Sequence, residues 1–374
     1  MERRIDVRQL VTVLTLFLIA QFAGLLLTFV TFPPTVAVAA SQAAQVQQQA
    51  PSAASYIWII VAEVIIIALV LMFVIRSYKG RSFFTLVEAY IILLGSFFFF
   101  FLIIGNILTT INSIALVAIS VACAIGVYLA KRSPRFDNQS FRNLVTIISS
   151  IGAGVFIGIS IGLQFGVLVL YAVLAIFAVY DYLAVFVLKF MIPLAKQAAT
   201  MNLAFMIGSS ELELHPKGSS KARAYTAEEL KSIRNQRLRG LIKQGSVPAV
   251  SSVMLGNGDI MLPMAVAAGA YVYTTSISLG ITIVLGAAVG LIATFWVLRR
   301  YRFGLPAIPP IFAFVSIALV IFSLVTGAYG SLLIVIFAFG AILSVTAMYL
   351  AIRRASVVQS ASPERVSGRK SRGR

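Results

Sequence analysis

Ten long apolar runs constrain what this chain of 374 residues can fold into. A transmembrane helix needs about 20 consecutive apolar residues. Runs of this kind occur at 10–32, 56–75, 84–108, 111–130, 144–163, 165–188, 248–272, 277–298, 305–326 and 329–352. The chain is 60% hydrophobic and only 11% charged, whereas soluble domains are about one quarter charged. No soluble fold could bury this much apolar surface, so we predict an all-α polytopic membrane protein.

The basic residues fall in alternate loops of the predicted membrane protein. All thirty Lys and Arg lie in six segments: 3–8, 76–81, 131–142, 189–243, 299–302 and 353–374. The loops between them contain none, which is typical of a protein whose positive loops stay in the cytoplasm. With ten spans, we expect the N-terminus and the C-terminus to be cytoplasmic. This distribution argues against a nucleic-acid-binding protein, despite the net charge of +18.

The spans divide the chain into four segments. They are 1–164 with spans one to five, 165–272 with spans six and seven, 273–352 with spans eight to ten, and the basic tail 353–374. The longest inside loop, 189–247, joins spans six and seven. Within it, SSELELHP (209–216) alternates polar and apolar residues, which predicts a short strand.

Two of the spans carry glycines at a spacing of four residues. These are Gly154, Gly158 and Gly162 in span five, and Gly286 and Gly290 in span eight. Residues four apart share one face of a helix, and glycine there lets a second helix approach closely. We therefore predict a close helix crossing at each of these two faces.

Four acidic residues lie inside the apolar runs: Glu63, Glu88, Asp181 and Asp259. A charged side chain at the bilayer centre costs on the order of 2.5–3.5 kcal/mol, so each of them requires an explanation. Glu88 lies near the inner end of its span and can reach the headgroups, so we interpret it as an interfacial acid. Glu63 lies deeper in span two, where it either bonds to a neighbouring helix or lines a pathway.

Asp181 and Asp259 are expected at matching depths in two sequential spans. Span six ends at Lys189, eight residues after Asp181, and span seven begins eight to eleven residues before Asp259. At the helical rise of 1.5 Å per residue, each carboxylate would lie about 12–17 Å beneath the inner surface. Because sequential spans are usually neighbours in space, we expect the two side chains to meet between antiparallel helices.

A pair of carboxyl groups in this position could hydrolyse a peptide bond. Two carboxyls about 3 Å apart share one proton, because both cannot be ionised cheaply. The ionised member can take a proton from water while the protonated member polarises a peptide carbonyl. This chemistry requires neither a metal nor another nucleophile, so we expect no cofactor.

Glycine and proline predict irregular backbone at two places. Gly256 and Gly258 precede Asp259 in LGNGDIMLP, where glycine suits a bend or a close backbone approach. Three prolines in GLPAIPP (304–310) predict an extended or broken segment at the start of span nine. Irregular backbone at membrane depth is tolerated against protein or a water-filled cavity, and such a cavity would admit the water that hydrolysis consumes.

Three motifs in these segments resemble those of the presenilin family of intramembrane aspartyl proteases. Tyr180-Asp181 resembles the family's YD motif in the sixth span, and Gly256-Asn257-Gly258-Asp259 resembles GxGD in the seventh. Pro306-Ala307-Ile308-Pro309 resembles PALP at the start of the ninth, with Ile308 in place of leucine. The order of the motifs and their span numbers agree as well, and the resemblance covers roughly 140–330.

The resemblance implies a presenilin-like bundle of nine transmembrane helices, to which the run 329–352 would add a tenth. It implies that Asp181 and Asp259 are catalytic. It also implies that Tyr180, Gly256, Gly258 and the residues Pro306, Ala307, Ile308 and Pro309 shape the site and contact the substrate. The expected substrates are single transmembrane helices in the lipid bilayer. The expected protein is an archaeal homologue that needs no metal and no obligatory partner subunits.

Two other functions compete with this interpretation. A cation or proton channel or transporter could use Asp181, Asp259 and Glu63 with a broken span nine, but the two halves of the chain show no repeat. Prepilin-type peptidases also carry GxGD, but they are shorter and place their first aspartate elsewhere. We therefore favour the intramembrane protease over the channel or transporter.

Overall fold

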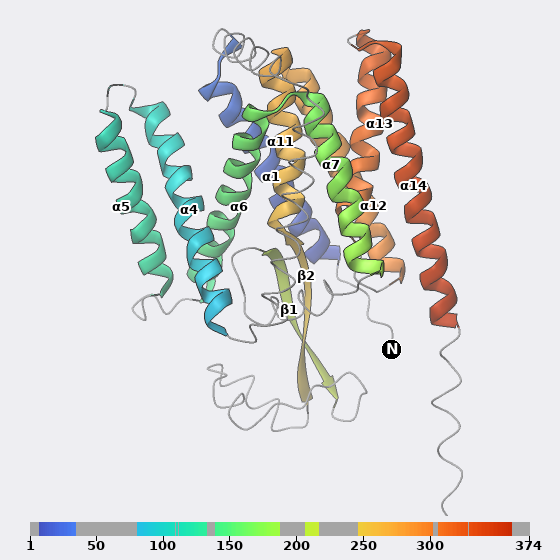
Figure 1. Cartoon of the computed structure of the whole chain (residues 1–374). Coiled ribbons are helices and arrows are strands. Elements are labelled where there is room, and N and C mark those ends of the chain that lie inside the picture. The colour runs from blue at the N-terminus through green and yellow to red at the C-terminus, as the bar shows by residue number, and fades with distance from the viewer. Residues whose placement is uncertain are drawn as a thin grey trace, which may run out of the picture. The chain divides into compact units, whose positions relative to one another are not determined.

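The computed structural model describes residues 7–34, 81–108, 110, 112–132, 139–187, 206–216, 246–301, 306–327 and 329–360. Nine α-helices lie within these residues: α1 (Val7–Thr31), α4 (Arg81–Ile107), α5 (Ser113–Arg132), α6 (Gln139–Gln164), α7 (Val167–Tyr182), α11 (Asn257–Thr274), α12 (Ile277–Tyr301), α13 (Ile308–Thr326) and α14 (Ser331–Ser360). The helix α7 continues as a π-helical turn, Leu183–Val187. Two strands, β1 (Met206–Pro216) and β2 (Ser246–Gly256), complete the described elements (Figure 1).

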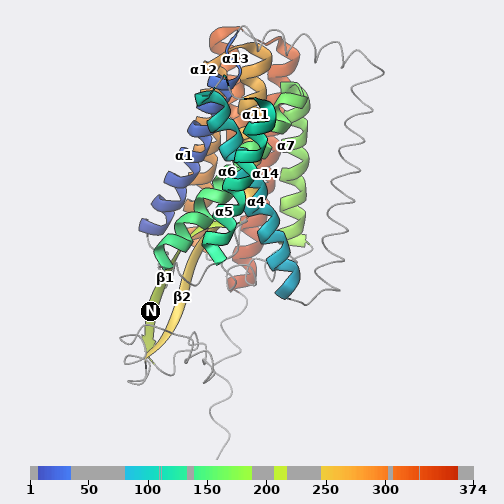
Figure 2. The same ribbon diagram turned by 90° about the vertical axis from the view of Figure 1, so that its left-hand side faces the viewer.

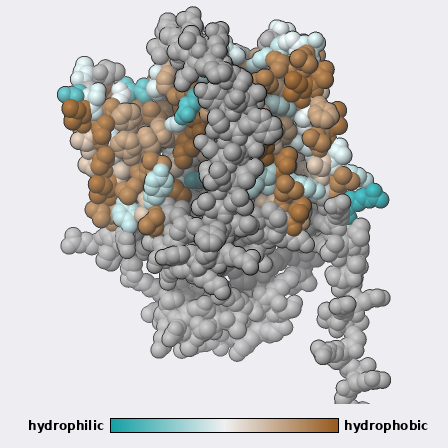
Figure 3. All heavy atoms as spheres, in the orientation of Figure 1, coloured by the Kyte–Doolittle hydropathy of each residue, from teal (hydrophilic) through white to brown (hydrophobic). Residues whose placement is uncertain are grey.

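Eight of the described helices are long and apolar enough to cross a membrane, and α11 is the exception. The protein is therefore an all-α polytopic membrane protein, as its composition predicts. The helices confirm the predicted spans one, three to six, and eight to ten, while the predicted second span, 56–75, lies outside the described residues. Many large hydrophobic side chains on the described helices are exposed, and hydrophobic residues predominate among the described helices visible in Figure 3, as expected for surfaces that face lipid.

The helix α11 lies inside the bundle, and this position explains its weaker hydropathy. It packs against α6, α7 and α12, with α4 and α5 beyond α6 and with α13 and α14 on the other side (Figures 1 and 2). Every residue from Leu262 to Val272 is buried. Because other helices shield α11 from lipid, its polar first turn, which contains Asn257 and Asp259, can lie within the bundle.

Both predicted glycine crossings are confirmed. A Cβ added at Gly158 would lie 2.7 Å from the Met261 carbonyl oxygen, and one at Gly162 would lie 2.7 Å from that of Ala265, so α6 packs directly on the α11 backbone. A Cβ at Gly290 would lie 2.6 Å from Cα of Ile311, on α13. Contacts this close are possible only where the Cβ is missing.

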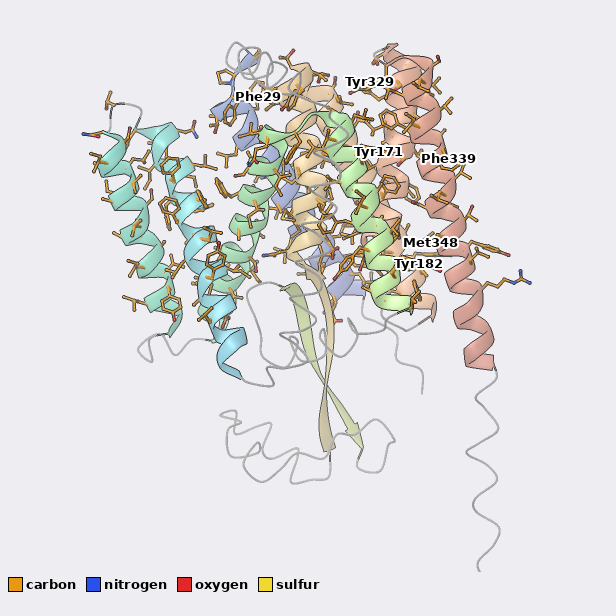
Figure 4. All side chains as sticks on the ribbon, viewed as in Figure 1. Phe29, Tyr171, Tyr182, Tyr329, Phe339 and Met348 are labelled. Atoms are coloured by element: carbon orange, nitrogen blue, oxygen red, sulfur yellow. The ribbon has the colours of Figure 1, made fainter. Side chains whose placement is uncertain are left out.

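Helix α14, which corresponds to the predicted tenth span, is part of the bundle. It packs along α13 and is 30 residues long, which is too long for a re-entrant half-span. Tyr171 of α7 joins the two helices, because its ring contacts Phe312 of α13 and Phe337 of α14 at centroid distances of 5.0 Å and 4.8 Å (Figure 4). Phe339 on the opposite face of α14 is 65% exposed, as expected for a lipid-facing side chain.

The strands β1 and β2 form a two-stranded sheet. The predicted strand 209–216 is confirmed within β1. The predicted start of span seven is wrong, because Ser246–Gly256 is a strand and the helix begins only at Asn257. This segment is a short run of small, polar and β-branched residues, and its hydrophobic pattern alone does not distinguish a strand from the end of a helix.

Candidate active site

The two intramembrane aspartates lie at facing ends of neighbouring helices. Asp181 is in the last turn of α7, and Asp259 is in the first turn of α11. The two helices pack against each other. The fold thus brings together two acids that are 78 residues apart in the sequence.

Asp181 is held by the start of α13. Its side chain is only 8% exposed, and its Oδ2 accepts a hydrogen bond of 3.2 Å from the backbone N–H of Ile308. The partial positive charge at the N-terminus of α13 also stabilises a carboxylate in this position. The expected PAL-type segment therefore contacts one of the two aspartates directly.

The prolines at the start of α13 leave few donors for this contact. Pro309 and Pro310 carry no N–H, and the N–H of Ile311 donates to the carbonyl of Ala307 at 3.3 Å. The N–H of Ile308 is therefore free to donate to the carboxylate. The expected broken segment is only partly found, because Pro306 and Ala307 precede the helix whereas Pro309 and Pro310 lie in its first turn. Proline is tolerated there, since the first N–H groups of a helix have no intrahelical partner.

Asp259 is held by its own chain. Its Oδ2 accepts a hydrogen bond of 3.1 Å from the backbone N–H of Gly256, the N-cap of α11. This is one half of a capping box, because glycine has no side chain to complete the other half. Asp259 is thus in the first helical turn rather than eight to eleven residues into a span. The depth inferred for it from helical rise therefore does not apply.

The two glycines of the GxGD segment are not required by the local backbone. Gly256 has φ −74° and ψ 151°, a conformation open to any residue, and the backbone changes there from strand to helix. Among the described residues, a Cβ at Gly256 would meet only Oδ2 of Asp259, at 3.6 Å, and a Cβ at Gly258 would meet nothing within 4 Å. The described residues would therefore leave room for a side chain at either position.

Three further residues considered in the sequence are the predicted site residue Tyr180 and the acidic residues Glu88 and Glu63. Tyr180 is half-buried beside Asp181, interacts electrostatically with it, and makes an edge contact with Phe177. Glu88 is half-buried in α4, which packs against α5 and α6. Glu63 lies outside the described residues.

One polar residue near the site was missed by the sequence interpretation. Gln21 of α1 is fully buried, and its Nε2 donates a hydrogen bond of 2.8 Å to the carbonyl of Ile260, which directly follows Asp259. A lone amide inside an apolar run was the available signal, since polar groups in transmembrane helices usually bond to a neighbouring helix.

The arrangement offers acid and base groups without a metal. In the described part of the chain, no group of three or more His, Cys, Asp and Glu could hold a metal ion. The available chemistry is that of two carboxyls on neighbouring helices, with the backbone amides of Ile308 and Ala307 beside Asp181 and that of Gly256 beside Asp259. Such a pair can exchange protons with a bound water and with a carbonyl oxygen.

Comparison with known proteins identifies the family. No curated protein sequence matches the chain. A family model does match it, that of the signal-peptide peptidase and presenilin aspartyl proteases, over residues 14–326. The matched region begins within α1, contains α4 to α7, β1, β2, α11 and α12, and ends at the last residue of α13. The chain therefore belongs to the signal-peptide peptidase and presenilin family of aspartyl proteases.

Proposed function

We propose that this protein is an intramembrane aspartyl protease that hydrolyses peptide bonds within or near the transmembrane helices of its substrates. Asp181 and Asp259 are its catalytic pair. The observation that carries the proposal is the placement of these two carboxyls at the end of α7 and the start of α11, two helices that pack against each other inside a membrane-spanning bundle. Membership of an aspartyl protease family supports the same reaction.

The reaction proceeds through general acid–base catalysis. The ionised carboxyl of the pair takes a proton from water, and the water oxygen attacks the peptide carbonyl carbon. The protonated carboxyl gives its proton to the carbonyl oxygen, which produces a neutral tetrahedral intermediate. The protonated carboxyl then gives its proton to the amide nitrogen while the other carboxylate takes one back from a hydroxyl of the intermediate, so that the C–N bond breaks and a carboxylic acid and an amine leave. The pair ends with one proton, as it began.

The substrate must be extended where it is cut. A peptide carbonyl inside a helix is bonded to the N–H four residues later, so the reacting segment has to unwind before attack. The space beside Gly258 and the non-helical residues Pro306 and Ala307 support binding of an extended chain next to the aspartates. Tyr180, Gly256, Ile308 and Pro309 complete the set that we assign to shaping this site.

The two-stranded sheet of β1 and β2 provides a way to hold an unwound substrate. The strand β2 ends at Gly256, three residues before Asp259, and it pairs with β1. A substrate segment that pairs with this sheet would be extended through backbone hydrogen bonds, as in other cases of β-augmentation. Sequence-independent pairing would suit a protease that accepts different transmembrane helices.

The loop charges support an orientation with both termini in the cytoplasm. The Lys and Arg residues lie in alternate loops, and 189–243 between spans six and seven is among the basic ones. Because Asp181 and Asp259 lie at the ends of α7 and α11 that this loop joins, cleavage takes place towards the cytoplasmic side. We further propose that the enzyme acts in the lipid bilayer without obligatory partner subunits.

The proposal is tested with purified protein and a single-span substrate tagged at both ends. In detergent and in liposomes, the wild type should produce two fragments whose masses sum to that of the substrate plus one water. An inhibitor with a hydroxyl where water would attack should block cleavage. Ion or proton flux through the liposomes without any cleavage would contradict the proposal and favour a channel or transporter.

A further inference from the structure

Gln21 links α1 to the turn that carries Asp259. Its side chain is 0% exposed, and its Nε2 donates a 2.8 Å hydrogen bond to the carbonyl oxygen of Ile260 across 239 residues of sequence. A neutral amide inside an apolar span is costly to bury unless it finds such a partner. This hydrogen bond therefore links α1 specifically to α11, and a contact with lipid could not replace it.

The turn that receives this bond has an incomplete helical ladder. Pro263 lies in α11 and has no N–H, so the carbonyl of Asp259 lacks its usual partner four residues later. A proline ring inside a helix is also crowded against the carbonyl of the preceding turn, so the first turn of α11 is held less firmly by the rest of the helix. Gln21 supplies a donor from outside at Ile260, the next carbonyl, and so fastens the weakened turn to α1.

The packing of α1 keeps the amide in place. Phe17, Ala20 and Thr28 are each 0% exposed, and together with Gln21 and Gly24 they form one buried stripe at helical spacing. A Cβ on Gly24 would collide with Sδ of Met264, on α11. The stripe thus sets α1 against α11 at a separation that Gln21 can bridge.

The oxygen of the Gln21 amide is less well satisfied than its nitrogen. Among the residues that the structure describes, no hydrogen-bond partner for the buried Oε1 of Gln21 is found. A buried amide satisfied at one end only gives little net stability, because the desolvation of its oxygen offsets the bond made by its nitrogen.

We propose that Gln21 is a positioning residue for Asp259: it holds the first turn of α11 so that this carboxyl faces Asp181. The inference rests on the proposed protease function. The amide of Gln21 exchanges no proton with the substrate and acts only through the backbone at Ile260.

The test compares Gln21→Met with Thr28→Val. Methionine nearly matches glutamine in shape but has no donor. Thr28 is equally buried two turns along the same helix, and its hydroxyl donates only to the carbonyl of Gly24, at 2.8 Å. We expect Gln21→Met to lower kcat about tenfold with KM nearly unchanged, because misplaced catalytic groups affect the transition state more than substrate binding. A hydroxyl-bearing transition-state mimic should bind more weakly by a similar factor. Thr28→Val should change neither quantity.

A second variant covers the case in which Gln21→Met does not fold. Gln21→Glu can donate to the Ile260 carbonyl only while its carboxyl is protonated. Because this position is fully buried, the carboxyl is protonated at low pH, and the kcat of Gln21→Glu at low pH should be close to that of the wild type. A folded Gln21→Glu enzyme with a strongly reduced kcat at low pH would overturn the inference, and so would a Gln21→Met enzyme with the kcat of Thr28→Val. Absence of cleavage by the wild type would instead overturn the proposed function.

Discussion

The backbone nitrogen of Ile308 lies 3.2 Å from Oδ2 of Asp181, and this hydrogen bond joins the start of α13 to the end of α7. Its length depends on where α13 begins, which is set by close packing on α12. A Cβ at Gly290 would lie 2.6 Å from Cα of Ile311 and 2.7 Å from the carbonyl oxygen of Pro310. Gly290 therefore allows α13 to begin beside Asp181.

Gly290→Ala should lower cleavage activity much more than it lowers stability. The added methyl meets backbone on α13, so the first turn has to move and the N–H of Ile308 moves with it. A displacement of about 1 Å at a catalytic group can reduce the rate by about a hundredfold. The measurement is kcat at a fixed substrate concentration in detergent, alongside the melting temperature.

Gly286→Ala is the matched control for this change. A Cβ at Gly286 would also be tight, 2.9 Å from the Phe314 carbonyl oxygen, but one turn farther from Asp181. It should reduce the melting temperature by a similar amount and activity by less. Equal losses of activity in the two variants would show that Gly290 has no particular effect on Asp181.

Alanine substitutions along α6 should affect stability in a graded way. A Cβ at Gly158 would lie 2.7 Å from the Met261 carbonyl oxygen, whereas one at Gly154 would lie 3.5 Å from Cγ2 of Ile260 and 3.6 Å from the Asn257 carbonyl oxygen. Overpacking of this kind costs about 1–3 kcal/mol, so Gly158→Ala should lower the free energy of unfolding by that amount. Gly154→Ala should be neutral or slightly stabilising, since alanine favours a helix over glycine. Similar melting temperatures for the two variants would contradict the described packing of α6 on α11.

The pH dependence of cleavage should be bell-shaped. The active form of the pair carries one proton, so loss of that proton at high pH and gain of a second at low pH should both lower kcat/KM. The profile should be measured in detergent between about pH 4 and pH 8, with the melting temperature recorded at each pH. A flat profile over this range would count against a shared proton.

Proline in β1 should interfere with substrate cleavage and leave the helices intact. Leu212→Pro and Leu214→Pro each remove a backbone N–H from the strand, and each lost ladder hydrogen bond is worth about 1 kcal/mol. We expect roughly tenfold slower cleavage for the double variant, with an unchanged helical circular dichroism spectrum. Leu212→Ala with Leu214→Ala keeps both N–H groups and is the control. Unchanged turnover in the proline variant would contradict the proposed role of the sheet of β1 and β2 in holding the substrate.

Much of this architecture could be predicted because lipid imposes a simple rule on sequence. Runs of about 20 apolar residues identify membrane helices wherever the helix faces hydrocarbon, and this rule predicted eight of the described helices, including α14. It gave the wrong start for α11, because a helix enclosed by protein no longer has to be apolar. The run before Asn257 is a strand, Ser246–Gly256, whose hydrophobic pattern resembles the end of a helix.

The contacts around the aspartates could be predicted only in part. A carboxylate in an apolar run is conspicuous, so Asp181 and Asp259 could be identified from sequence alone. The backbone N–H of Ile308 could not, because the effect of Pro309 and Pro310 depends on whether they lie inside a helix or in its first turn. Gln21 contacts the carbonyl of Ile260 across 239 residues, and no local pattern encodes a pairing over that distance.

If Asp181 and Asp259 act as one catalytic pair, removal of either carboxyl should abolish cleavage. The measurement is the rate at which Asp181→Asn, Asp259→Asn and a mixture of the two purified variants cleave a tagged single-span substrate. Glu88→Gln, which removes an intramembrane acid on α4, is the control. The wild type and Glu88→Gln should produce fragments, whereas neither aspartate variant nor their mixture should produce any. Cleavage that survives either aspartate substitution in a purified sample would show that the two aspartates are not a catalytic pair.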